Sequence, residues 1–92
     1  MKRFDSAIGT VELTDERRNH ILQFHPDIKS YWKHFPATLA NPDILRLSKF
    51  DPKAKIFYRS ASEQKKYLAI VVKTNHRNFI LTAYLTYKIK HH

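Results

Sequence analysis

Cysteine is absent from the 92 residues, glycine occurs once and proline four times. Without cysteine the chain has no disulfide framework, no thiolate nucleophile and no Cys-based zinc or iron–sulfur site. This composition suits a reducing compartment, and we expect a cytoplasmic protein. The scarcity of glycine and proline, together with 42% hydrophobic residues, predicts a chain that folds around a core.

Long apolar runs are missing as well. No stretch of eighteen apolar residues occurs, and the first six residues lack the apolar segment of a signal peptide. We therefore expect neither a membrane-spanning segment nor secretion. A length of 92 residues predicts one domain over residues 1–92, with its core in 7–90, and excludes a multidomain enzyme. His91 and His92 are set aside as a candidate tag remnant.

Acidic residues are few, and their distribution is uneven. The chain has 17 Lys and Arg against 8 Asp and Glu, a net charge of +9. Residues 1–45 hold six of each kind, whereas residues 46–92 hold eleven basic residues against Asp51 and Glu63. The positive field therefore comes from the second half. Such a field attracts polyanions, of which nucleic acid is the commonest in cells, although a lysine-rich solvated surface is the alternative explanation.

The first half of the chain predicts helices. Residues 8–13 are typical of a short strand or an extended lead-in, and Thr14 is a good N-cap for a helix that continues to Phe24. Because the residue before a proline is biased out of the helical region, this helix should stop or kink before Pro26. A second helix is expected over residues 28–40, in which Pro36 either kinks the helix or starts a new turn.

The second half of the chain predicts strands, because the hydrophobic period changes to two after a turn at residues 41–43. Four strands are expected, over residues 44–48, 55–60, 66–73 and 78–90. Connections this short favour antiparallel hairpins. We therefore expect an α+β fold, with one or two N-terminal helices packed on a roughly four-stranded antiparallel sheet.

The last predicted strand has two different faces. Alternate residues from 79 to 89 are apolar and form the expected core face. The other face is polar and basic and carries Ile80, Thr82, Tyr84, Thr86, Lys88 and Lys90. In strand 55–60 the same alternation puts Arg59 and Phe57 on one face and Tyr58 on the other.

Histidine, arginine and hydroxyl side chains are the candidates for chemistry. His20 and His25 stand five residues apart, so they cannot hold a metal from one helical face, and no carboxylate cluster accompanies them. We therefore expect no metal and no cofactor. RNA carries its own nucleophile, the 2′-hydroxyl, and its cleavage needs a base, an acid and a cation that stabilises the phosphorane. Histidine suits either proton role, and arginine suits the phosphate.

The resulting inventory has a catalytic part and a binding part. The catalytic candidates are His20, His25, Arg59, Thr82 and Tyr84. The candidates for binding RNA are cations, hydroxyls and one aromatic ring, namely Lys55, Tyr58, Lys73, Thr86, Lys88 and Lys90. Structural alternatives exist: His25 could cap the first helix by donating to a carbonyl, and Arg59 could pair with Glu63 or Asp51.

Several short motifs, taken in chain order, carry a resemblance to a known family. The motifs are His20-Ile21, His25-Pro26-Asp27, Asn41-Pro42-Asp43, Phe57-Tyr58-Arg59, Tyr67-Leu68 before Val71-Val72-Lys73, and Thr82-Ala83-Tyr84-Leu85-Thr86. In this order they resemble the small phage nucleases related to barnase, EndoU, colicins E5 and D, and RelE (the BECR fold). The resemblance covers roughly residues 11–90. It implies helices followed by a four-stranded antiparallel sheet, with a ribonuclease site across the sheet and the preceding helix.

The resemblance also implies roles for individual residues. The helical histidine of the family corresponds to His20, the histidine before proline to His25 and the strand cation to Arg59. The hydroxyl on the last strand corresponds to Thr82 or Tyr84. Which residue is the general acid and which the base stays open, because members of the family exchange these roles.

The function expected from these observations is a metal-independent endoribonuclease. It would cleave RNA by attack of the 2′-hydroxyl and leave a 2′,3′-cyclic phosphate. The resemblance implies a toxin of a toxin–antitoxin, phage or mobile-element system, with RNA and an acidic antitoxin or immunity protein as partners. Two alternatives stay open: a non-catalytic RNA- or DNA-binding module that uses the basic sheet face, and an interaction protein that binds an acidic partner.

Overall fold

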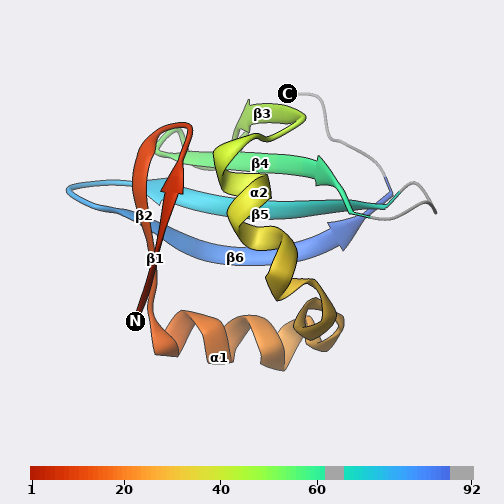
Figure 1. Ribbon diagram of the computed structural model, residues 1–92. Coiled ribbons are helices and arrows are strands. Elements are labelled where there is room, and N and C mark those ends of the chain that lie inside the picture. The colour runs from red at the N-terminus through yellow and green to blue at the C-terminus, as the bar shows by residue number, and fades with distance from the viewer. Residues whose placement is uncertain (62–65, 88–92) are drawn as a thin grey trace.

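The fold is α+β, with a sheet and a layer of helices. The structure, a computed structural model, describes residues 1–61 and 66–87. Along the chain the elements are β1 (Lys2–Ser6), β2 (Gly9–Leu13), α1 (Asp15–Phe24), the 3₁₀ helix η1 (Pro26–His34), α2 (Phe35–Ala40), β3 (Ile44–Leu47), β4 (Ala54–Ser60), β5 (Tyr67–Thr74) and β6 (Asn78–Thr86). In Figure 1, α2 lies in front of β4 and β5, and α1 lies along β6. The expectation of an α+β fold is confirmed.

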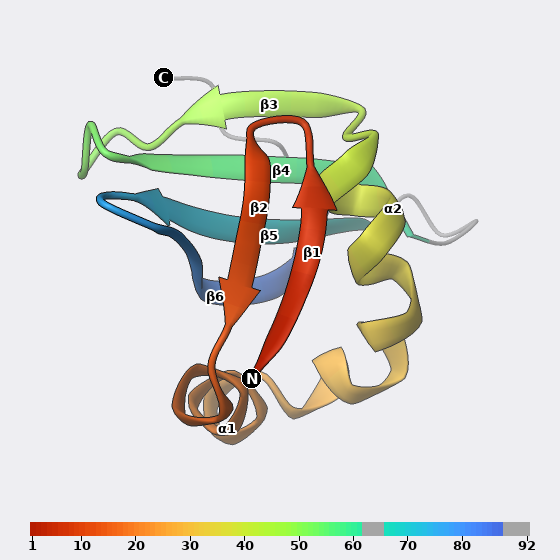
Figure 2. The same cartoon turned by 60° about the vertical axis from the view of Figure 1, so that its left-hand side comes forward.

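The sheet has six strands in the order β1-β2-β6-β5-β4-β3. Strands β3 to β6 pair antiparallel, as expected from their short connections. The prediction of four antiparallel strands is nevertheless wrong, because β1 and β2 form an additional hairpin and β2 runs parallel to β6. The parallel contact pairs Val11 with Asn78 and Glu12 with Phe79. Figure 2 shows this hairpin lying across the strands β4 to β6.

Strand β2 lies within residues 8–13, where a short strand or an extended segment is predicted, but β1 was missed because it has little apolar patterning. Of the five residues in β1, only Phe4 is buried. The turn into β2 uses the single glycine, Gly9, at a φ of +104°, a conformation that other residues rarely adopt. The hairpin is tied to the helical layer by the amide of Ala7, which donates to the carbonyl of Leu39 over 2.9 Å.

Helix α1 begins where the sequence predicts. The Thr14 hydroxyl accepts a hydrogen bond from the amide of Arg17 over 3.2 Å, and the helix ends before Pro26. The second predicted helix is instead divided into η1 and α2, and Pro36 lies in the first turn of α2. Proline is tolerated there because its missing N–H would have no partner within the helix. Within the described residues no helix has the length and apolarity needed to cross a bilayer.

The main core lies between the helices and the sheet. It is made of side chains that are buried from solvent: Val11 and Leu13 from β2, Ile21, Ile28, Phe35 and Leu39 from the helices, and Phe57, Leu68, Ile70, Val72 and Ile80 from the sheet. These residues fix α1 against β6 and α2 against β4 and β5. The helical layer therefore covers one face of β4 to β6. The side chains on the opposite face of these strands lie outside the main core.

A β-bulge changes the faces expected for the last strand. Val71 is opposite Thr82, whereas Val72 is opposite Ile80, so Leu81 is an extra residue in β6. As a result Ile80 and Ala83 are both fully buried in the main core. The prediction that Ile80 shares the polar face with the residues from 82 onward is therefore wrong.

Candidate functional site

The second face of the sheet carries three tyrosines, Tyr58, Tyr67 and Tyr84, and is called the tyrosine face below. Direct pairing across the strands defines its rows, because opposed residues point to the same side. One row is Ile44, Tyr58, Ala69 and Tyr84, and the next is Arg46, Ile56, Val71 and Thr82. A second, smaller core of Ile56, Tyr58 and Ala69 lies here, and Tyr67, Val71 and Tyr84 pack around it.

The hydroxyls of Tyr58 and Tyr84 are joined by a hydrogen bond. Both residues are paired with Ala69, whose small side chain leaves space between them. Burial of the phenol raises the pKa of Tyr84 to about 12, and the Tyr58 side chain adds to the shift through its charge and its hydrogen bond. Tyr84 therefore stays protonated near neutral pH, where it can donate a hydrogen bond but cannot act as a base.

His25 reaches the same row from the end of α1. The centroids of the His25 and Tyr84 rings lie 6.1 Å apart, with 39° between their planes. The backbone of His25 is held on both sides: its amide donates to the carbonyl of Ile21 over 2.7 Å, and its carbonyl accepts from the amide of Ile28 over 3.0 Å. The amide, and not the imidazole, therefore closes the end of α1. The half-buried imidazole makes no capping hydrogen bond to the start of η1.

Arg59 lies on the opposite side of the sheet. It shares the helix-facing side with Phe57, and its Nη1 donates to the carbonyl of Asn41 over 2.6 Å, at the end of α2. Its partner is thus neither Asp51 nor another carboxylate in the described residues, and Glu63 lies outside them. The structure does not bring Arg59 together with Tyr84.

His20 contacts a different ring from His25. It is half-buried on α1, and the centroid of its ring lies 4.7 Å from that of Phe24, a side chain that is 61% exposed. Of the five predicted catalytic residues, the structure therefore brings together His25, Tyr84 and Thr82, the last of these being two residues before Tyr84 on the same face.

The lysines predicted to bind RNA lie in three different environments. The ammonium of Lys73 pairs with the carboxylate of Asp51 over 2.8 Å, which also lowers the pKa of Asp51. Lys55 is opposite Val72 and so points to the helix-facing side. Lys88 and Lys90 lie outside the described residues.

The two other predicted RNA contacts lie on the tyrosine face. Tyr58 is only 1% exposed, so it cannot stack on a base in this conformation. Thr86 is half-buried and opposite Tyr67, which is also half-buried. The accessible aromatic surface of this face is therefore that of Tyr67 and Tyr84.

Arg46 is a cation that sequence reasoning missed. It is half-buried on the tyrosine face, opposite Ile56 and in the same cross-strand row as Thr82. The alternation of residues 44–47 contained the signal, but using it requires the register between β3 and β4. Arg59 stood out instead because it follows two aromatic residues.

Neither a metal-binding cluster nor a match to another protein identifies the function of this site. In the part of the chain that the structure describes, no group of three or more His, Asp or Glu side chains is arranged to hold a metal ion. No protein-family model, curated protein or solved structure matches this chain. The function is therefore inferred from the residues of the tyrosine face.

Proposed function

We propose that this protein is a metal-independent endoribonuclease whose active site lies on the tyrosine face, beside β6. The observation that carries the proposal is the juxtaposition of His25 and Tyr84, whose rings lie 6.1 Å apart. An imidazole, which can serve as a general base, stands beside a phenol that keeps its proton to a pKa of about 12. The net charge of +9 supports an RNA substrate.

The two side chains supply different parts of the reaction. His25 takes the proton of the 2′-hydroxyl, and the 2′-oxygen attacks phosphorus. The bond from phosphorus to the 5′-oxygen breaks, the 5′-oxygen takes a proton from water, and the RNA is left with a 2′,3′-cyclic phosphate. Tyr84, which has a single O–H, turns it from Tyr58 to a non-bridging phosphoryl oxygen as negative charge develops on that oxygen. Arg46 adds positive charge to the same face.

The order of the elements supports a BECR-like nuclease, related in fold to barnase and RelE. Helices precede four antiparallel strands, β3 to β6, and the proposed site lies on the sheet face opposite the main core. The β1–β2 hairpin is then an addition to that arrangement. In this proposal the protein is a toxin, and its partner is an acidic antitoxin or immunity protein whose charge complements the excess of basic residues.

The test is cleavage of a defined RNA by the purified protein in EDTA, with and without ribosomes. We expect products that end in a 2′,3′-cyclic phosphate. Strict dependence on Mg²⁺, or a 5′-phosphate on the downstream fragment, would contradict the mechanism. RNA binding that weakens with salt but gives no product under either condition would favour the non-catalytic binding module, for which Tyr67 and Tyr84 offer half-buried rings for stacking.

A further inference from the structure

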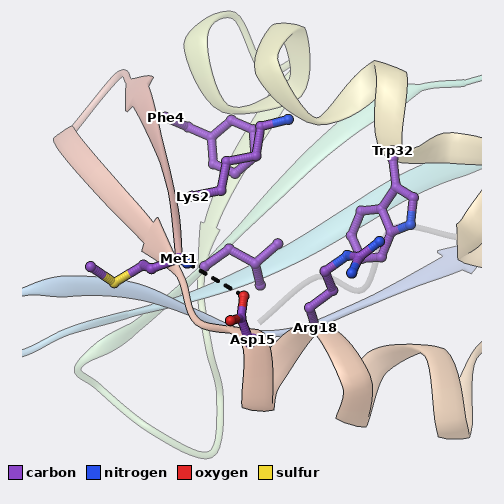
Figure 3. Close-up of a pocket in the computed structure, with 7 residues that line it drawn as sticks. Met1, Lys2, Phe4, Asp15, Arg18 and Trp32 are labelled. Carbon is purple, nitrogen blue, oxygen red and sulfur yellow. Dashed lines mark hydrogen bonds and ion pairs between the residues drawn. The ribbon is translucent and has the colours of Figure 1, made fainter.

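A pocket lies between the β1–β2 hairpin and the helices (Figure 3). None of the three tyrosines of the tyrosine face lines it. Its volume is about 360 Å³, which is within the range of small-molecule sites. The mainly apolar side chains of the lining are Met1, Phe4, Leu13 and Trp32. Lys2 and Arg18 contribute cations, and Asp15 contributes a carboxylate. The pocket therefore combines an apolar interior with mainly positive charge.

The apolar walls are held in place from behind. The ring of Phe35, which is fully buried, lies 4.6 Å from the Trp32 ring and 6.3 Å from the Phe4 ring, measured between centroids. Phe4 and Leu13 are themselves buried members of the main core. Because these side chains are already packed, a ligand would enter a preformed site at a low cost in ordering.

The cations of the pocket lie over its aromatic walls. The ammonium of Lys2 is 5.4 Å from the centre of the Phe4 ring, and the guanidinium of Arg18 is 5.7 Å from that of Trp32. In the described residues neither cation has a carboxylate within 4.0 Å. The carboxylate of Asp15 pairs with the terminal amino group of Met1 over 3.4 Å, the contact drawn in Figure 3. Lys2 and Arg18 are both exposed, so their charges are accessible to a ligand.

We propose that this pocket binds a small aromatic carboxylate. Its ring contacts Phe4, Leu13 and Trp32, and its carboxylate accepts hydrogen bonds from the guanidinium of Arg18, with Lys2 as a second cation. Besides its cations the lining offers few polar groups, namely the carboxylate of Asp15 and the indole N–H of Trp32, which favours an apolar ring over a nucleobase with several polar edge groups. This site is independent of the proposed ribonuclease activity.

Trp32 is the only tryptophan of the chain, so its fluorescence reports on this pocket directly. The probe is 3-phenylpropionate, and the matched control is 3-phenylpropanamide, which has the same ring and length but no charge. We expect a saturable change with the carboxylate and binding at least about tenfold weaker with the amide, because the charged hydrogen bond is lost. Equal binding of the two probes, or no saturable change with either, would overturn the proposal.

A second arm uses protein variants in isothermal titration calorimetry, which does not depend on the fluorescence of Trp32. Arg18→Gln should weaken binding of 3-phenylpropionate at least about tenfold. Lys29→Gln removes one exposed positive charge from η1 outside the pocket and should leave the affinity unchanged. Equal weakening of binding in both variants would indicate that the ligand is attracted by the net charge of the protein alone. That result would refute a specific binding site in this pocket. Circular dichroism on each variant confirms that the fold is retained, and RNA cleavage is not used as a readout.

Discussion

The hydroxyls of Tyr58 and Tyr84 meet across β5, above the small side chain of Ala69. Two phenols on strands that are not neighbours are thereby joined by one hydrogen bond. Burial, with the Tyr58 side chain as a smaller cause, raises the pKa of Tyr84 and keeps the phenol protonated, which is the form able to stabilise a developing phosphoryl charge. The smallness of Ala69 is thus a condition for the geometry of the proposed site.

Tyr84 should make stability fall at alkaline pH. Its pKa in the folded protein is about 12 and its usual value is 10.0, so the folded state holds the proton more tightly than the unfolded state does. The stabilisation is fully present below pH 10 and is lost as the pH rises to about 12. Urea unfolding of wild type and Tyr84→Phe should show a smaller loss between these pH values in the variant. A parallel decline in both proteins would refute this role, and Tyr87→Phe, an exposed tyrosine, is the control.

The hydroxyl of Tyr84 should also matter for cleavage. Tyr84→Phe is expected to lower the single-turnover rate by about 10²-fold, because one preorganised donor to the phosphoryl oxygen is lost. Tyr67→Phe, on the same face but outside the row of Tyr84, should stay within a few-fold of wild type. If the two variants lose activity equally, the hydroxyl of Tyr84 has no special role.

His25 should be the main proton-transfer residue. His25→Gln is expected to reduce the single-turnover rate by about 10² to 10⁴, as for the loss of a general acid or base, while RNA affinity is retained. His76→Gln, in an exposed turn, is the control and should cleave as wild type does. His20→Gln tests the other helical histidine, whose ring contacts Phe24. If His20→Gln loses activity while His25→Gln cleaves normally, the active site lies beside His20 on α1 and not beside His25.

Arg59 should contribute to stability rather than to catalysis. Its guanidinium donates to the carbonyl of Asn41 at the end of α2, so Arg59→Ala should lower the free energy of unfolding by about 1 kcal/mol. The cleavage rate of the folded variant should remain within a few-fold of wild type. Denaturant unfolding and single-turnover kinetics on the same preparation separate the two effects. If the Arg59→Ala variant is stable but inactive, Arg59 acts in catalysis and this prediction is wrong.

A larger side chain at position 69 should change both the stability of the protein and the pKa of Tyr84. Ala69 is fully buried between Tyr58 and Tyr84, so Ala69→Leu is expected to cost about 1–3 kcal/mol of stability by overpacking. The added side chain should also separate the two hydroxyls and remove the part of the Tyr84 pKa shift that the Tyr58 side chain causes, while the larger part, due to burial, remains. Spectrophotometric titration of tyrosinate absorbance measures that change, and an unaltered titration curve would show that the phenols meet elsewhere.

Local signals in the sequence predicted the local structure. Thr14 was identified as an N-cap because a helix start depends on neighbouring residues, and the strands after residue 43 were found from their alternation. The hairpin strand β1 was missed because only Phe4 of its residues is buried. The bulge at Leu81 was also missed, since an extra residue shows only against the partner strand.

The candidate site depended on contacts that no local pattern contains. His25 and Tyr84 were both in the predicted set, but their proximity follows from the packing of α1 against β6. The alternation of β4 correctly separated Arg59 from Tyr58, yet it could not show which face would carry Tyr84 as well. Arg46 became visible only with the register of β3 on β4.

Because β2 pairs with β6, this part of the sheet can form only after β6 has been synthesised. Val11 and Leu13 leave the ribosome early, but the strand that pairs with β2 begins at Asn78. Until β6 has been made, these two core residues remain uncovered on that side and the sheet cannot close, because pairing between distant segments must wait for both. The proposed site therefore cannot form before β6 has been synthesised, because Tyr84 lies in that strand.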